Sequence, residues 1–164
     1  MTRLRLALVH RLMDGGSLAA AEATITEILG ADPDDIEANI LRAELLLRRG
    51  DTETARDKFR MVSQTAGLSD RTAAVAHAGL GAACRGLGEA EDATRSFAMA
   101  IDRGAVDTRT WLGLAEVFFA MGEWQALSKL AAAARAVAGL DWVPTARVPT
   151  HQQCATQKQG SPYE

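Results

Sequence analysis

The sequence predicts an all-α protein, a right-handed α-solenoid of about four helix-turn-helix repeats. Three observations favour this fold class. The 164-residue chain is 48% hydrophobic but only 5% aromatic, and Ala and Leu, which are among the best helix formers, dominate its hydrophobic residues. Runs rich in Val, Ile, Thr and Tyr, which would indicate strands, are absent from the sequence. A pattern marked by glycine also returns at a nearly constant interval, which is typical of a repeat architecture.

A glycine that follows a helical run and precedes Ser, Asp or Glu marks each repeat. The four marker glycines are Gly16, Gly50, Gly88 and Gly122. Their successive spacings are 34, 38 and 34 residues, so the middle interval carries four extra residues, which we place near 70–73. Because four residues make about one helical turn, we expect a longer second helix or a longer loop there, with the stack still in register.

Positions at a fixed distance from each marker glycine hold residues of similar size. Five residues after the glycines lie Ala21, Ala55, Ala93 and Leu127. Nine residues after them lie Ile25, Phe59, Phe97 and Ala131. Seven residues before them lie Val9, Ala43, Gly81 and Ala115. Small residues in one position and large ones in another are what closely crossing helices require, because close-packed interiors leave no room for mismatched volumes.

The first helices of the repeats also have start signals. We expect Asp34 to cap the helix that follows Pro33, with Glu37 completing a capping box. Ser69 or Asp70 is the expected cap of the first helix in the third repeat.

The same positions match a known family motif. The fourth repeat reads Trp111-x2-Leu114-Ala115-x2-Phe118. The second and third repeats carry the companion A-x3-F motif, as Ala55-x3-Phe59 and Ala93-x3-Phe97. This combined pattern resembles the tetratricopeptide repeat, and the resemblance covers roughly residues 2 to 138.

The repeat register divides the chain into two parts. Four repeats are expected at about 2–35, 36–69, 74–107 and 108–138. The tail at 139–164 contains Pro144, Pro149 and four Gln residues, and its polarity predicts a poorly ordered segment. The alternative is that Trp142 and Val143 fold back over the last helix as a cap.

Composition and motifs exclude several function classes. The net charge of −3 gives no footprint for nucleic acid, and no apolar run approaches the roughly 18 residues that membrane insertion needs. The two cysteines, Cys84 and Cys154, do not form a disulfide framework, which favours a cytoplasmic protein. No two histidines stand three or four residues apart, and no phosphate-binding loop occurs. We therefore expect no metal, no cofactor and no enzymatic activity.

The resemblance implies where a partner would bind. In this family the first helix of each repeat lines a concave groove, and counting back from each marker glycine gives its side chains. The candidate groove residues are Leu6, His10, Met13, Ile40, Glu44, Leu47, Arg85, Arg109, Leu112, Glu116 and Phe119. The Lys and Asn residues with which some members clamp a C-terminal carboxylate are missing from these positions. For each large apolar residue the alternative is packing against a neighbouring helix.

These expectations point to a protein-protein interaction module, an adaptor or scaffold that binds a protein or peptide. The groove mixes apolar and charged side chains, which favours an apolar or amphipathic partner segment. Two alternatives are the N-terminal repeat portion of a larger enzyme and a secretion-chaperone-like protein. A homo-dimer through the Ala131–Ala134 face of the last repeat is a further alternative.

Overall fold

The structure is a computed structural model that describes residues 2–105 and 107–139. The described residues form eight α-helices and no strand. The helices are α1 (Thr2–Asp14), α2 (Leu18–Ala31), α3 (Ile36–Arg49), α4 (Thr52–Ser63), α5 (Asp70–Gly86), α6 (Ala90–Asp102), α7 (Thr108–Met121) and α8 (Trp124–Ala138). Most of the tail predicted at 139–164, with Trp142, Val143 and Cys154, lies outside the described residues.

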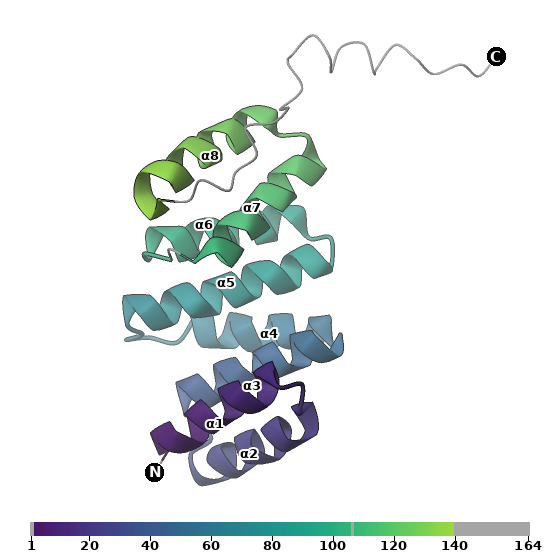
Figure 1. The fold of residues 1–164 in the computed structure, drawn as a ribbon, viewed down its shortest axis with the longest axis vertical. Coiled ribbons are helices and arrows are strands. Elements are labelled where there is room, and N and C mark those ends of the chain that lie inside the picture. Colours follow the sequence, from purple (N-terminus) through teal and green to yellow (C-terminus); the bar gives the residue numbers. More distant parts are fainter. Residues whose placement is uncertain (1, 106, 140–164) are drawn as a thin grey trace, which may run out of the picture.

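The helices form four antiparallel pairs that stack along the long axis of the molecule (Figure 1). The first helices α1, α3, α5 and α7 contact one another in succession. Each second helix contacts its own first helix, and α2, α4 and α6 also contact the first helix of the next pair. Among the described residues no second helix contacts another second helix. The stack is an α-solenoid, and because its first helices lie closer together than its second helices, they line the inner, concave side.

The marker glycines lie in the turns between paired helices. Gly50 and Gly122 follow α3 and α7 with φ of 85° and 72°, in the left-handed region that ends these helices at little steric cost. The helix starts differ from expectation by one residue in the second repeat, because Asp35 and not Asp34 accepts the bond from the backbone N–H of Ala38, at 2.9 Å. Ser69 caps α5 by accepting from Thr72, as one of the two expected alternatives.

The four extra residues lengthen a first helix. The prediction of a longer second helix is wrong, since α4 has 12 residues, whereas α5 has 17 against 14 in α3 and α7. The loop before α5, at 64–69, is also longer than the loop before α3, at 32–35. Asp70 lies four residues further from its marker glycine than the first residues of the other first helices do. The insertion adds one turn at the N-terminus of α5, which Ser69 caps, and this leaves the glycine register unchanged.

Phenylalanine rings fill the boundaries between repeats. Phe59 of α4 packs against Gly79 of α5, and Phe97 of α6 packs against Gly113 of α7. Both rings are fully or almost fully buried, and they belong to one hydrophobic cluster that runs from the second to the fourth repeat. A second cluster joins the first repeat to α3. The small and large residues found in the sequence are therefore partners in these contacts.

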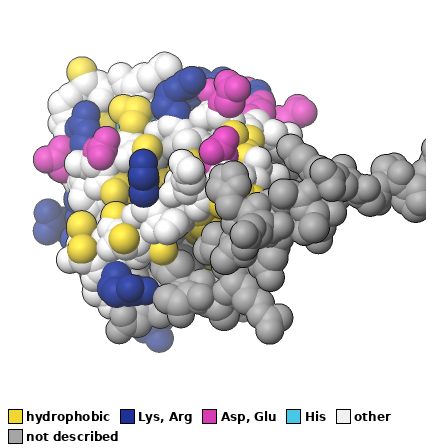
Figure 2. Space-filling view, turned by 90° about the horizontal axis from the view of Figure 1, so that it is seen from above, with side chains coloured by type: hydrophobic (Ala, Val, Ile, Leu, Met, Phe, Trp, Pro, Cys, Tyr) yellow, Lys and Arg dark blue, Asp and Glu magenta, His cyan; other side chains and the backbone are white. Residues whose placement is uncertain are grey.

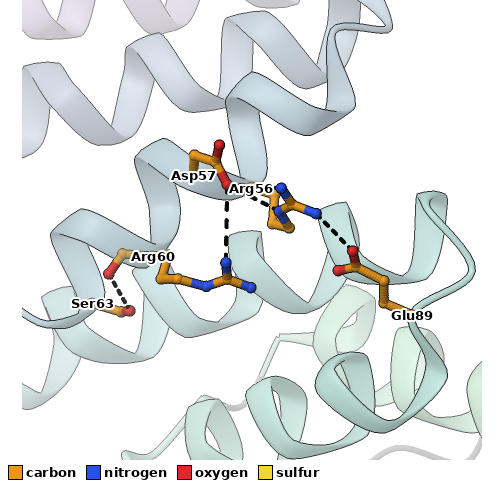
Figure 3. Close-up of polar contacts among 5 residues, drawn as sticks. All are labelled: Arg56, Asp57, Arg60, Ser63 and Glu89. Atoms are coloured by element: carbon orange, nitrogen blue, oxygen red, sulfur yellow. Dashed lines mark hydrogen bonds and ion pairs between the residues drawn. The ribbon is translucent and has the colours of Figure 1, made fainter.

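Ion pairs on the outer side also join successive repeats. Arg56 of α4 donates from Nη1 to Oε1 of Glu89, in the turn before α6, at 2.6 Å, and its other nitrogens bond Asp57 (Figure 3). Arg49 of α3 pairs with Glu22 of α2 at 2.7 Å. Such pairs on the partly exposed rim add little stability individually, but they fix how one repeat sits on the next.

Candidate functional site

The candidate groove lies on the concave side, where α1, α3, α5 and α7 run next to one another. All eleven predicted residues are on these four first helices. Their burial differs strongly along the stack. The side chains of α7 are open to solvent, those of α3 are half-buried or buried, and two of the three on α1 are buried.

Three predicted groove residues belong to the interior. Leu6 and Ile40 are 5% exposed and Met13 is 2% exposed, and each packs in a hydrophobic cluster. The alternative of packing against neighbouring helices therefore holds for these three. The reason is that the first helix of the following repeat covers them, as the contacts of α1 with α3 and of α3 with α5 show.

The exposed apolar side chains of the groove are concentrated on α7. Leu112 is 39% exposed and Phe119 is 63% exposed. Phe119 is held by an edge-on contact with Trp124 of α8, with ring centroids 5.4 Å apart and planes at 88°. The groove positions named from the first helices could not include Trp124, because it belongs to a second helix. Its contact presents the Phe119 ring as a fixed apolar surface.

An ion pair crosses the groove between two repeats. Arg85 of α5 pairs with Glu116 of α7, and both side chains are partly exposed. Glu116 lies four residues after Leu112 and three before Phe119, so these three side chains share one face of α7. The pair neutralises both charges at this end of the groove. Because both side chains are partly exposed, their remaining polar atoms can form hydrogen bonds with a partner.

Glu44 of α3 is the half-buried acidic residue of the groove. Burial raises the pKa of its carboxyl group, while the positive charges of His10, Arg48 and Arg109 act in the opposite direction. His10 on α1 and Arg109 on α7 are thus electrostatic neighbours of Glu44, although they come from different repeats. The groove therefore brings charges from three first helices to one place.

Small side chains lie in the middle of the groove. On α5 the groove positions hold Ala78 and Ala82, which are half-buried, and Val75, which is 41% exposed. These residues occupy groove positions of the repeat register, although they are not among the candidate groove residues predicted from the sequence. Counting back from the marker glycine Gly88 identifies all three as groove positions from the sequence alone. They make a shallow apolar floor between Glu44 and the α7 side chains.

Cys84 and His77 lie in the interior, away from the groove. Cys84 is fully buried, and burial together with the nearby carboxylate of Glu89 raises the pKa of its thiol to about 11. His77 is also buried, which lowers the pKa of its imidazole. No cluster of three or more His, Cys, Asp or Glu suited to a metal ion occurs in the described part of the chain. None of the described helices is both long and apolar enough to cross a bilayer.

Four stacked helix pairs with an open concave face define the class of helical-repeat proteins. Residues 6–67 match the family model described as tetratricopeptide repeat. No curated protein matches the chain in sequence. This match covers the first two of the four helix pairs and supports a tetratricopeptide repeat assignment, that is, a protein-protein interaction module in general, and the solved structures described below share the fold.

Three solved structures share the fold. The MamA protein is 19% identical, with a TM-score of 0.66 over 83% of this chain and 72% of that chain. TTC0263, a thermophilic TPR protein of Thermus thermophilus, is 22% identical, with a TM-score of 0.61 over 84% of this chain and 74% of that chain. A chain of the APC/C hetero-tetramer Cut9-Hcn1 is 14% identical, with a TM-score of 0.73 over 94% of this chain but only 29% of that chain. At these identities the likeness concerns the fold.

Proposed function

We propose that the chain is an adaptor or scaffold that binds an apolar or amphipathic segment of a partner protein on its concave face. The observation that carries the proposal is the exposed apolar surface of Leu112 and Phe119, directly beside the Arg85–Glu116 ion pair. Exposed aromatic and aliphatic side chains next to satisfied charges are typical of an interface core with its polar rim. The tetratricopeptide fold supports a protein partner over a small molecule.

The shape of the groove indicates how the segment would lie. Large apolar side chains of the partner fit over the shallow floor of Val75, Ala78 and Ala82, where this chain offers little bulk of its own. An amphipathic helix that lays one face in a groove presents anchors three or four residues apart, which suits such a floor. The polar face of the helix would then meet the charged side chains at the edges.

The environment of Glu44 favours a hydrogen bond from a basic side chain of the partner. Its carboxylate is partly removed from water, which raises its pKa and makes a further hydrogen bond from a basic side chain favourable. Glu116 is less suited to this role, since Arg85 already pairs with it. We therefore expect a Lys or Arg of the partner near Glu44 and an apolar anchor near Phe119.

A peptide-display library provides a test, with the full chain as bait and synthetic peptides from the selection as probes. Phe119→Ala should weaken binding of the selected peptides by about 30-fold, because removing an aromatic anchor commonly costs about 2 kcal/mol. Met61→Ala is the matched control, since Met61 is 64% exposed, close to the 63% of Phe119, but lies on the second helix α4. The control should bind as the original chain does.

Two results would contradict the groove. Selected peptides that bind Phe119→Ala and the original chain equally well would place their site elsewhere. A loss of similar size in Met61→Ala would indicate general apolar adhesion to exposed side chains. Circular dichroism should show unchanged helicity in both variants, because both side chains are mostly exposed.

A further inference from the structure

The α1 end of the stack exposes hydrophobic side chains in positions that are mostly buried in the other repeats. Leu4 is 77% exposed and Leu8 is 49% exposed. Leu4 lies twelve residues before its marker glycine, and the residues in that position of the other repeats are at most 2% exposed. They are Ala38, Ala76 and Thr110. Leu80 and Leu114, which correspond to Leu8 in the third and fourth repeats, are also buried, whereas the corresponding residue of the second repeat is the exposed Arg42.

The α7–α8 end shows the complementary pattern. Leu112 lies ten residues before its marker glycine, where Leu6 and Ile40 are buried in their repeats. Phe119 corresponds in the same way to the buried Met13. Figure 2, which looks down on the α7–α8 end, shows hydrophobic side chains spread over this end between charged ones. Each end of the described stack therefore exposes side chains that a neighbouring repeat would cover.

The interface between successive repeats is formed three times inside the chain. In each case a helix pair packs against the first helix of the next pair, as α2 does against α3, α4 against α5 and α6 against α7. In the first of these contacts, Ile25 and Ile28 of α2 share a cluster with Ala38 and Leu41 of α3. Within the described residues no repeat precedes α1 and none follows α8. The two ends carry the two halves of this interface.

We propose that the chain associates end to end with a second copy of itself, so that the α7–α8 end of one protomer packs against α1 of the next. The contact continues the interface that already exists between repeats, and one copy supplies both of its halves. Solenoids normally end in a polar surface, and soluble monomers rarely leave wide apolar patches uncovered. Because the two surfaces differ, the contact is head-to-tail, and it can add copies at either end.

One residue limits the strength of this contact. Arg11 is exposed five residues before its marker glycine, whereas Leu45, Ala83 and Val117 are buried in that position of the other repeats. Its aliphatic stem can cover apolar surface, but its guanidinium has to stay in contact with water. The contact between copies is therefore weaker than the contact between repeats, and the association is reversible and depends on concentration.

This proposal does not rest on the proposed function, but Leu112 and Phe119 belong to both surfaces. Leu4 and Leu8 lie at the α1 end and not among the groove residues. A variant with Leu4→Glu and Leu8→Glu therefore separates the two proposals. It should lose self-association and still bind the peptides selected on the original chain. Both side chains are largely exposed, so the variant should fold.

The test is the mass of the full chain measured by light scattering over a hundredfold range of concentration. The measured mass of the original chain should rise with concentration, from that of a monomer toward those of a dimer and larger species. The Leu4→Glu, Leu8→Glu variant and a Phe119→Glu variant should each stay monomeric alone. An equimolar mixture of the two should form a dimer and stop there, because it contains one intact end of each kind. Met61→Glu, on the outer side of α4, should associate as the original chain does.

Three results would overturn the proposal. The original chain could stay monomeric at every concentration. The Leu4→Glu, Leu8→Glu variant could still form dimers, which would show that two α7–α8 ends pair symmetrically. The mixture of the two folded variants could fail to form the dimer, which would exclude a head-to-tail contact through these surfaces.

Discussion

The ring of Phe97 is held between two glycines that come from different repeats. A Cβ atom at Gly113 of α7 would lie 2.5 Å from Cζ of this ring, and one at Gly81 of α5 would lie 2.8 Å from its Cδ1. Both distances are shorter than van der Waals contact allows. The ring therefore has no free side toward which it can move, and it fixes the distance between α5, α6 and α7.

Gly113→Ala should destabilise the chain by about 1–2 kcal/mol. The added methyl group collides with a ring that cannot shift, and overpacking of this kind costs more than the gain in helix propensity returns. Urea unfolding followed by circular dichroism measures the change. Gly30→Ala in α2 is the matched control, because nothing lies within 4 Å of its new Cβ, and this variant should gain about 0.5–1 kcal/mol. Phe97→Leu should recover part of the loss in the Gly113→Ala background.

Arg48→Ala should destabilise the contact between α1 and α3. Arg48 of α3 donates to the backbone carbonyl of Met13 at 2.6 Å and pairs with Asp14 at 3.2 Å, so it satisfies the C-terminal end of α1. We expect a loss of about 1 kcal/mol and faster amide exchange in α1. Arg42→Ala, an exposed residue of the same helix, should change neither quantity. Equal amide exchange in both variants would contradict the capping role.

His77 should make the fold sensitive to mild acid. Burial lowers the pKa of its imidazole from the ordinary value of 6.5, with a smaller contribution from the charge of Arg103. Below about pH 6.5 the unfolded chain therefore binds more protons than the folded chain does, and the free energy of unfolding falls as pH falls. His77→Gln, which stays neutral, should show a shallower decrease between about pH 7 and pH 5. Parallel curves for the two proteins would remove His77 as the cause.

Cys84 should lower the free energy of unfolding at alkaline pH. Burial and the nearby carboxylate of Glu89 raise the pKa of its thiol from 9.0 to about 11. Between these values the folded chain keeps a proton that the unfolded chain has lost, so the free energy of unfolding falls as pH rises. In a Cys154→Ser background, the thiol should react slowly with a disulfide reagent in the native state and quickly in urea. Cys84→Ala should flatten the alkaline decrease in stability, and an unchanged slope would contradict this assignment.

Features that depend on local sequence could be predicted. The marker glycines, the alternation of small and large positions and the α5 cap at Ser69 follow from backbone conformation and from side-chain volume, which the sequence states directly. The sequence also located the four extra residues near 70–73, but it did not determine which element they lengthen. A helical turn fits equally well into α4, into the loop or into α5, and the spacing of the marker glycines does not select among them; the structure places the turn in α5.

The groove was harder to predict than the repeats. The periodic positions correctly collect residues of the four first helices, but position alone does not say how much of each side chain stays exposed. Leu6 and Leu112 occupy equivalent positions, yet one is buried and the other is exposed, because α3 covers the first and no described helix covers the second. The pairing of Arg85 with Glu116 likewise depends on the distance between α5 and α7.

The sequence by itself therefore determined that this protein is a stack of four helix pairs, because each repeat encodes its own turn and its own small and large contact positions. The tertiary structure alone decided which faces of that stack remain open. It buries Met13 and Ile40, leaves Phe119 exposed beside an ion pair, and leaves Leu4 uncovered at the opposite end. The physical reason is that a periodic sequence specifies the contact between neighbouring repeats, whereas exposure depends on whether a neighbour is present.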